Sequence, residues 1–135
     1  MIAAVEATFS LSEAKLGLIP STISPYVINA TVVLPSIVDA VVIDAGSEPD
    51  FAGTPVVHLD GAGAGAGVSG LTLAAGSDGS TIRGLMVTGF ARDGIVVDSS
   101  NNLIAGNWVG TDGSSDLGNG EDGIQVNGSS NTIGG

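Results

Sequence analysis

The chain lacks cysteine and has few basic residues, and both absences exclude kinds of site. With no cysteine among 135 residues, disulfides, zinc–thiolate sites and thiol nucleophiles are excluded. Three basic residues against 14 acids leave a net charge of −11, so we expect no nucleic acid and no anionic membrane as partner. No 18-residue apolar run is present to span a membrane, and residues 1–6 lack the basic region of a signal peptide.

Glycine is abundant and unevenly distributed. Residues 1–30 contain one of the 22 glycines, and residues 31–135 contain the other 21. An apolar content of 43% is too high for a disordered acidic tail, and this much glycine is not typical of a helical bundle. The change in composition near residue 30 predicts two segments, residues 1–30 and residues 31–135.

The second segment repeats itself in short apolar sets separated by glycine, serine, asparagine and aspartate. The first set is Gly70–Leu73, Gly94–Val97 and Gly123–Val126; the second is Ser80–Gly84, Asn102–Gly106 and Asn131–Gly135; the third is Leu85–Val87 and Asn107–Val109. Strands this short are not stable alone, so the repeat predicts coils that stack on one another as a parallel β-solenoid. An earlier, less regular coil is expected from strands at Thr31–Leu34, Val41–Asp44 and Val56–Asp60, giving three to four coils of an all-β fold.

Alternation along these strands predicts which side chains face the core. Four inward ladders are expected: Leu71, Ile95 and Ile124; Leu73, Val97 and Val126; Ile82, Ile104 and Ile133; and Val87 and Val109. The outward positions are Thr72, Val96, Gln125, Arg83, Ala105, Met86 and Trp108. Asn102 and Asn131 fall at equivalent turns, where stacked amides would satisfy backbone groups.

Residues 31–135 resemble the right-handed parallel β-helix repeats of bacterial surface or secreted proteins, which are pectin-lyase-like in fold. The similarity rests on Val42–Asp44, Leu59–Gly61, Ser80–Leu85, Ile104–Asp112 and Asn131–Gly135. It implies a non-catalytic structural or binding module, an extracellular or cell-surface location for the parent protein, and carbohydrate as a possible partner. The alternative is a fragment of a carbohydrate-active lyase or hydrolase, because one scaffold carries many activities.

Residues 1–30 resemble an internal piece of the crotonase (enoyl-CoA hydratase) family through the run Ala7–Pro20. The resemblance gives Glu13 the place of a carboxylate that serves these hydratases as general acid and base. The oxyanion-hole glycines, the second carboxylate and the coenzyme A surface are missing, so an inactive remnant is the second alternative. We expect a strand, a turn and a helix begun near Ser21 or Thr22, capping the first coil of a chimeric chain.

Two candidate sites remain. No cofactor is expected unless calcium binds to Asp112, Asp116, Glu121 and Asp122; the alternative is that these carboxylates are solvated turn residues. Trp108 is a candidate platform for stacking a sugar ring; the alternative is that its indole packs against a loop or the N-terminal segment.

Other motifs favour structural interpretations. Two GxGxxG matches, residues 65–70 and 118–123, precede strands rather than helices and are read as turns. Asp44 and Asp60 are a weak hydrolase pair, and His58 is expected to be structural. The last coil, ending at Ile133–Gly135, is expected to expose unpaired strand edges and to permit head-to-tail self-association, which the acidic charge opposes at low salt.

Overall fold

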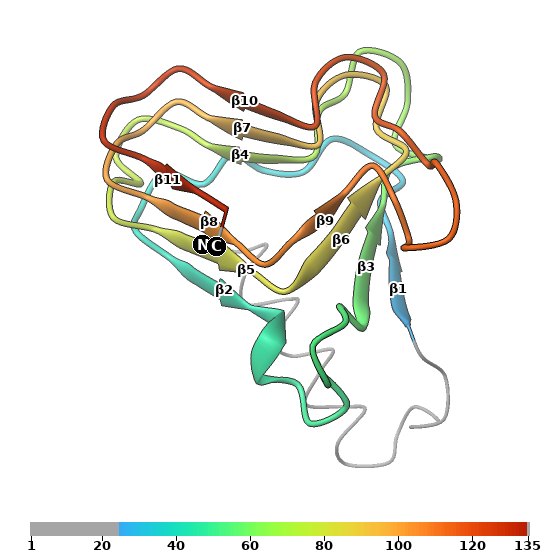
Figure 1. The fold of residues 1–135 in the computed structure, drawn as a ribbon. Helices are drawn as coiled ribbons and strands as arrows, with labels where there is room; N and C mark the ends of the chain where they lie inside the picture. Colours follow the sequence, from blue (N-terminus) through green and yellow to red (C-terminus); the bar gives the residue numbers. More distant parts are fainter. Residues whose placement is uncertain (1–24, 135) are drawn as a thin grey trace.

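The computed structural model describes residues 25–134, in which eleven short strands and one 3₁₀ turn make up the regular structure (Figure 1). The elements are β1 (Tyr26–Asn29), β2 (Val42–Asp44), η1 (Ala45–Ser47), β3 (Val57–Asp60), β4 (Leu71–Leu73), β5 (Thr81–Arg83), β6 (Leu85–Thr88), β7 (Ile95–Val97), β8 (Leu103–Ala105), β9 (Trp108–Val109), β10 (Ile124–Val126) and β11 (Thr132–Ile133). The described part of the chain is therefore essentially all-β.

The strands form three sheets, and every strand pair within them is parallel. Sheet A has the order β1-β3-β6-β9, sheet B the order β4-β7-β10, and sheet C the order β2-β5-β8-β11. Ile37 adds a fourth layer to sheet B through a parallel bridge to Leu73. From β1 onward the chain visits sheets A, B and C in turn, four times, an arrangement consistent with a parallel β-helix.

The register matches the predicted ladders. Leu71, Ile95 and Ile124 pair in sheet B, as do Leu73, Val97 and Val126; Ile82, Ile104 and Ile133 pair in sheet C, and Val87 pairs with Val109 in sheet A. In the middle layers these side chains are fully buried: Ile82, Val87, Ile95 and Val97 are each 0% exposed. Burial of this apolar surface is the main source of stability for strands of two to four residues.

Phe90 also belongs to the core, although the ladders do not include it. Its ring is 1% exposed and lies directly against Gly61, where a Cβ would approach Phe90 Cγ to 2.3 Å. Glycine at position 61 is therefore required by the close approach of an aromatic ring.

One expectation for the first coil is wrong. No strand forms at Thr31–Leu34, where Val32 and Val33 are each 65% exposed. The first strand is β1 instead, which pairs with β3 and turns Tyr26 and Ile28 toward the core. The expected N-terminal strand and turn, and the start of the expected helix near Ser21 or Thr22, lie outside the described residues. The division of the chain at residue 30 stays a prediction.

Three asparagine side chains each bond a corner of the layer before their own. Asn107 Oδ1 accepts a hydrogen bond from Leu85 N at 3.0 Å, and Asn107 Nδ2 donates to Ile82 O at 2.9 Å. One amide thus bridges a C=O and the N–H three residues later, which are the two groups that a tight turn must satisfy. The same bridge recurs with Asn119 on Phe90 N and Val87 O, and with Asn131 on Asn102 N and Ser99 O.

We predict that Asn107→Ala lowers the free energy of unfolding by about 1–3 kcal/mol, because two corner groups lose their partner. Asn107→Asp also destabilises the fold, since a carboxylate accepts but does not donate. Urea denaturation followed by circular dichroism measures both effects. Asn127→Ala is the control: Asn127 is exposed and its amide bonds only side chains, so a cost equal to that of Asn107→Ala would contradict the bridging role.

Candidate functional site

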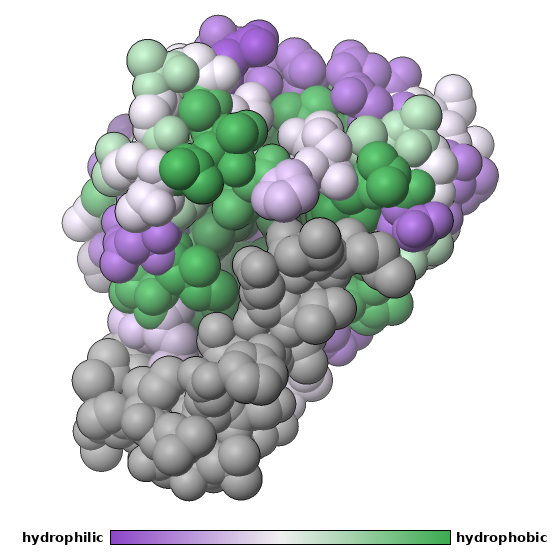
Figure 2. All heavy atoms as spheres, turned by 180° about the vertical axis from the view of Figure 1, so that it is seen from behind, coloured by the Kyte–Doolittle hydropathy of each residue, from purple (hydrophilic) through white to green (hydrophobic). Residues whose placement is uncertain are grey.

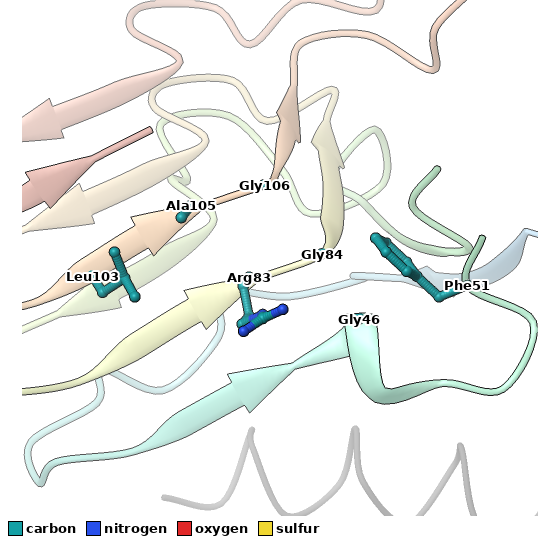
Figure 3. A pocket seen from close by; sticks show the side chains of 7 residues that line it. All are labelled: Gly46, Phe51, Arg83, Gly84, Leu103, Ala105 and Gly106. Atoms are coloured by element: carbon teal, nitrogen blue, oxygen red, sulfur yellow. The ribbon is translucent and has the colours of Figure 1, made fainter. Parts of the chain in front are cut away.

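A small open pocket of about 200 Å³ lies where sheet C turns into sheet A (Figure 3). Its lining comes from two successive layers and from the segment after β2: Gly46, Phe51, Arg83, Gly84, Leu103, Ala105 and Gly106. Arg83, Leu103 and Ala105 occupy alternate positions of β5 and β8, whose intervening residues Ile82 and Ile104 are core residues. The pocket is therefore on the outer face of sheet C.

Glycine at position 84 allows the segment after β2 to approach the corner between β5 and β6. Gly84 has a φ of +77°, in the left-handed region that favours glycine. A Cβ there would lie 2.4 Å from Gly46 N, so any side chain would push η1 away. The corner one layer later uses Gly106, with a φ of +64°. Small residues on this side leave the space that forms the pocket.

Arg83 supplies the positive charge of the pocket. Its Nε lies 3.3 Å from Asp44 Oδ1, and the two side chains are 54% and 30% exposed. Asp44 Oδ1 is buried and makes no well-oriented hydrogen bond, so this contact is an ion pair rather than a bidentate bridge. In Figure 3 the Arg83 side chain lies between Leu103 and the Phe51 ring.

A hydrogen bond from sheet A holds the segment that carries Phe51. Tyr26 OH donates to Asp50 Oδ2 at 2.5 Å, which fixes residue 50 beside the first strand. This hydrogen bond, together with the negative charges of Asp50 and Glu48, raises the pKa of Tyr26 to about 12. Phe51 itself packs against the core, half-buried.

The pocket offers chemistry suited to a small polyhydroxylated ligand. The Arg83 guanidinium donates several hydrogen bonds, and the Phe51 ring provides an apolar face. The volume of the pocket is below the range of pockets for drug-sized ligands.

The structure does not bring the four predicted calcium ligands together. Asp112 Oδ1 accepts from the backbone of Ser114 and Ser115 at 2.8 and 2.7 Å, and these bonds lower the pKa of Asp112. Asp116 lies in a bridge with Thr111, Glu121 pairs with Arg92 at 3.0 Å, and Asp122 N donates to Asp93 Oδ1. Within residues 25–134 no three acidic or histidine side chains are grouped so as to hold a metal ion.

Trp108 packs against the loop that follows it. A Cβ on Gly113 would lie 2.3 Å from the indole Cζ3, so the backbone of this loop lies directly on the ring. The side chain is half-buried, and it shares its outward register with His58 and Met86, which are 9% and 4% exposed. Met86 is therefore outward in register, as predicted, but it is buried.

The remaining candidates have structural partners or lie elsewhere. His58 Nε2 is 2.7 Å from Thr88 Oγ1, and Asp60 Oδ1 accepts from Ala62 N at 2.9 Å. Asp44 faces Arg83 instead, so the two aspartates of the hydrolase pair have separate partners. Glu13 lies outside the described residues, and its crotonase-like role stays a prediction.

Comparison with known proteins assigns the chain to no family. The chain matches no family model, and no significant similarity links it to a curated protein or to a solved structure. In the part of the chain that the structure describes, no helix has the length and apolar character needed to cross a membrane.

The sequence interpretation missed both the pocket and two of the three bridging asparagines. Gly84 and Gly106 occupy equivalent positions in successive repeats, which indicates that the two corners share one backbone geometry. Nothing in the repeat predicts Phe51, because its segment belongs to a connection that no other layer copies.

We predict that Tyr26, the single tyrosine, ionises well above its ordinary pKa of 10.0. The folded state holds this proton more tightly than the unfolded state, so the stabilisation is complete below pH 10 and is lost as pH rises toward 12. Phenolate absorbance during a pH titration measures the shift. Asp50→Ala should return the midpoint toward 10, whereas Asp39→Ala, at an exposed position, should not; a wild-type midpoint near 10 would rule out the Tyr26–Asp50 bond.

Proposed function

We propose that the chain is a non-catalytic structural or binding module, built as a right-handed parallel β-helix of the kind found in the repeat regions of bacterial surface or secreted proteins. Parallel strands joined by a crossover are right-handed in about 98% of cases, which supports the hand. The repeat motifs Ser80–Leu85 and Ile104–Asp112 support the class. An extracellular or cell-surface location of the parent protein belongs to the same proposal.

The observation that carries this proposal is the way backbone groups are satisfied from layer to layer. Side chains at the corners bond the neighbouring layer: Val41 N donates to Ser80 Oγ, Ser80 N to Asn102 Oδ1, and Asn102 N to Asn131 Oδ1, at 2.8–3.0 Å. Ser80 and Asn102, which are among the most buried polar residues, thus use their side chains to bond the neighbouring layer. A rigid stack that presents outer faces is what a spacer or a binding platform requires.

The proposal predicts a cooperatively folding β-protein that turns over none of the substrates suggested by the two resemblances. We expect a β-type circular dichroism spectrum and one thermal transition with an unchanged midpoint in calcium, since within residues 25–134 the loop acids are not grouped so as to hold a metal ion. Uronic acid polymers and acyl-CoA esters are assayed on the same preparation. Turnover of either would overturn the non-catalytic assignment, and a calcium-raised midpoint would assign the loop a metal site.

Carbohydrate binding at the pocket is the second candidate, favoured by the placement of Arg83 between an aromatic ring and an aliphatic side chain. Neutral oligosaccharides are the expected ligands, because the net charge of −11 repels polyuronates at low ionic strength.

This candidate predicts amide shift changes around Phe51, Arg83 and Leu103 when neutral oligosaccharides are titrated in an NMR experiment. Arg83→Ala should weaken binding about tenfold or more, equivalent to about 1.4 kcal/mol. Arg92→Ala is the matched control, because Arg92 pairs with Glu121 and does not line the pocket. Equal losses in the two variants, or shifts elsewhere on the surface, would exclude the pocket as the binding site.

A further inference from the structure

We propose that His58 and Met86 form a binding site for a soft monovalent metal ion such as copper(I), with Trp108 beside it. His58 lies on β3 and Met86 on β6, the two middle strands of sheet A (Figure 1). The two residues are paired directly in the parallel register, and Met86 is also paired with Trp108 on β9. The inference goes beyond the proposed structural role, because it gives the outer face of sheet A a ligand.

His58 and Met86 lie on the outer face of sheet A, and both are buried there. On each strand the residues before and after belong to the hydrophobic core, so alternation turns His58 and Met86 to the opposite face. Even so, His58 is only 9% exposed and Met86 only 4%. Their burial therefore comes from contacts on the outer face rather than from the core.

The two side chains carry the donor atoms that copper(I) prefers, an imidazole nitrogen and a thioether sulfur. The chain has no cysteine, so no thiolate competes for a soft ion, and its only histidine and one of its two methionines are in this pair. Metal bonds of about 2 Å to nitrogen and about 2.3 Å to sulfur add up to a span close to the ~4.8 Å between neighbouring strands. Residues paired in register on adjacent strands thus have a suitable separation to hold one ion between them.

Thr88 orients the imidazole ring. His58 Nε2 is 2.7 Å from Thr88 Oγ1, and Thr88 is 2% exposed. With the ring proton on Nε2, the imidazole donates to this hydroxyl, and Nδ1 keeps the lone pair that a metal ion needs. Within residues 25–134, Nδ1 has no hydrogen-bond partner. The imidazole is thus held by one nitrogen and can coordinate through the other.

Trp108 adds an aromatic ring next to the pair. It follows Met86 in the outward register, and the backbone of the loop at Gly113 packs against its indole. Contacts between sulfur and an aromatic ring are favourable, and a cation is attracted to the face of an indole. A half-buried indole beside the thioether therefore suits a cation that has lost most of its hydration shell.

The charge of the chain favours a cation, and the donor atoms favour a soft one. The net charge is −11, and in Figure 2 hydrophilic groups cover much of the upper edge of the molecule. A negative field concentrates cations near the surface and disfavours anionic ligands. Hard ions such as calcium prefer clustered oxygen donors, which an imidazole and a thioether do not provide.

Titration with silver(I) tests the proposal, because silver(I) is as soft as copper(I) and needs no reductant. Silver nitrate is added to the chain in a chloride-free buffer. The readouts are the fluorescence of Trp108, the only tryptophan, and the two methionine methyl signals in NMR spectra. One equivalent of silver should change the fluorescence and shift one methyl signal. Met86→Leu, which nearly conserves side-chain volume, and His58→Gln should each weaken binding about tenfold or more.

The matched control is Met86→Leu combined with Leu103→Met. This double variant keeps two methionines but moves one to a 38% exposed position on the outer face of sheet C, so its binding should be as weak as that of Met86→Leu. Calcium nitrate at the same concentration should leave both readouts of the wild type unchanged.

Four results would overturn the proposal: no response of the wild type to silver, undiminished binding in Met86→Leu, recovery of binding in the double variant, or an equal response to calcium. Circular dichroism of each sample separates loss of the site from loss of the fold. Failure of the metal proposal therefore leaves the structural role standing.

Discussion

Every strand in this molecule is too short to persist without the strand above or below it, and in-register parallel pairing is the constraint on which the rest depends. Pairing brings equivalent residues of successive layers together, so one aliphatic residue every 22–29 positions becomes a continuous ladder such as Ile43, Ile82, Ile104 and Ile133. Packing and hydrogen bonding then select the same register, because a slip of one residue would turn each ladder outward.

Much of this arrangement was predictable because it repeats. The inward ladders and the strands β2 to β11 follow from alternation and from spacing along the chain. The first layer was misjudged because it has no earlier copy for comparison: Thr31–Leu34 is rich in β-branched residues, yet the strand forms at Tyr26–Asn29, where β3 provides a partner. Local preference was outweighed by the availability of a neighbour.

The pocket, in contrast, could not be predicted from the repeat. Arg83 and Ala105 were predicted from the repeat to point outward, but the pocket that they line also includes Phe51, which follows Asp50, the acceptor of a hydrogen bond from Tyr26. Tyr26 and Asp50 are 24 positions apart, and the segment that carries Asp50 and Phe51 is a connection that occurs once. Features that the repeat duplicates can be read from one chain, whereas features built by single connections need the three-dimensional arrangement.

The asparagine bridges set the order in which the corners gain their hydrogen-bond partners during synthesis. Asn107 closes the corner at Ile82–Leu85, and Asn131 closes the corner at Ser99–Asn102, so each corner is completed by a residue synthesised 22–29 positions later. A ribosome releases these residues in order, so the polar groups of such a corner lack their amide partner until the following layer has been synthesised. The hydrogen bonds of these corners are thus completed one layer at a time during synthesis, each by an asparagine of the following layer.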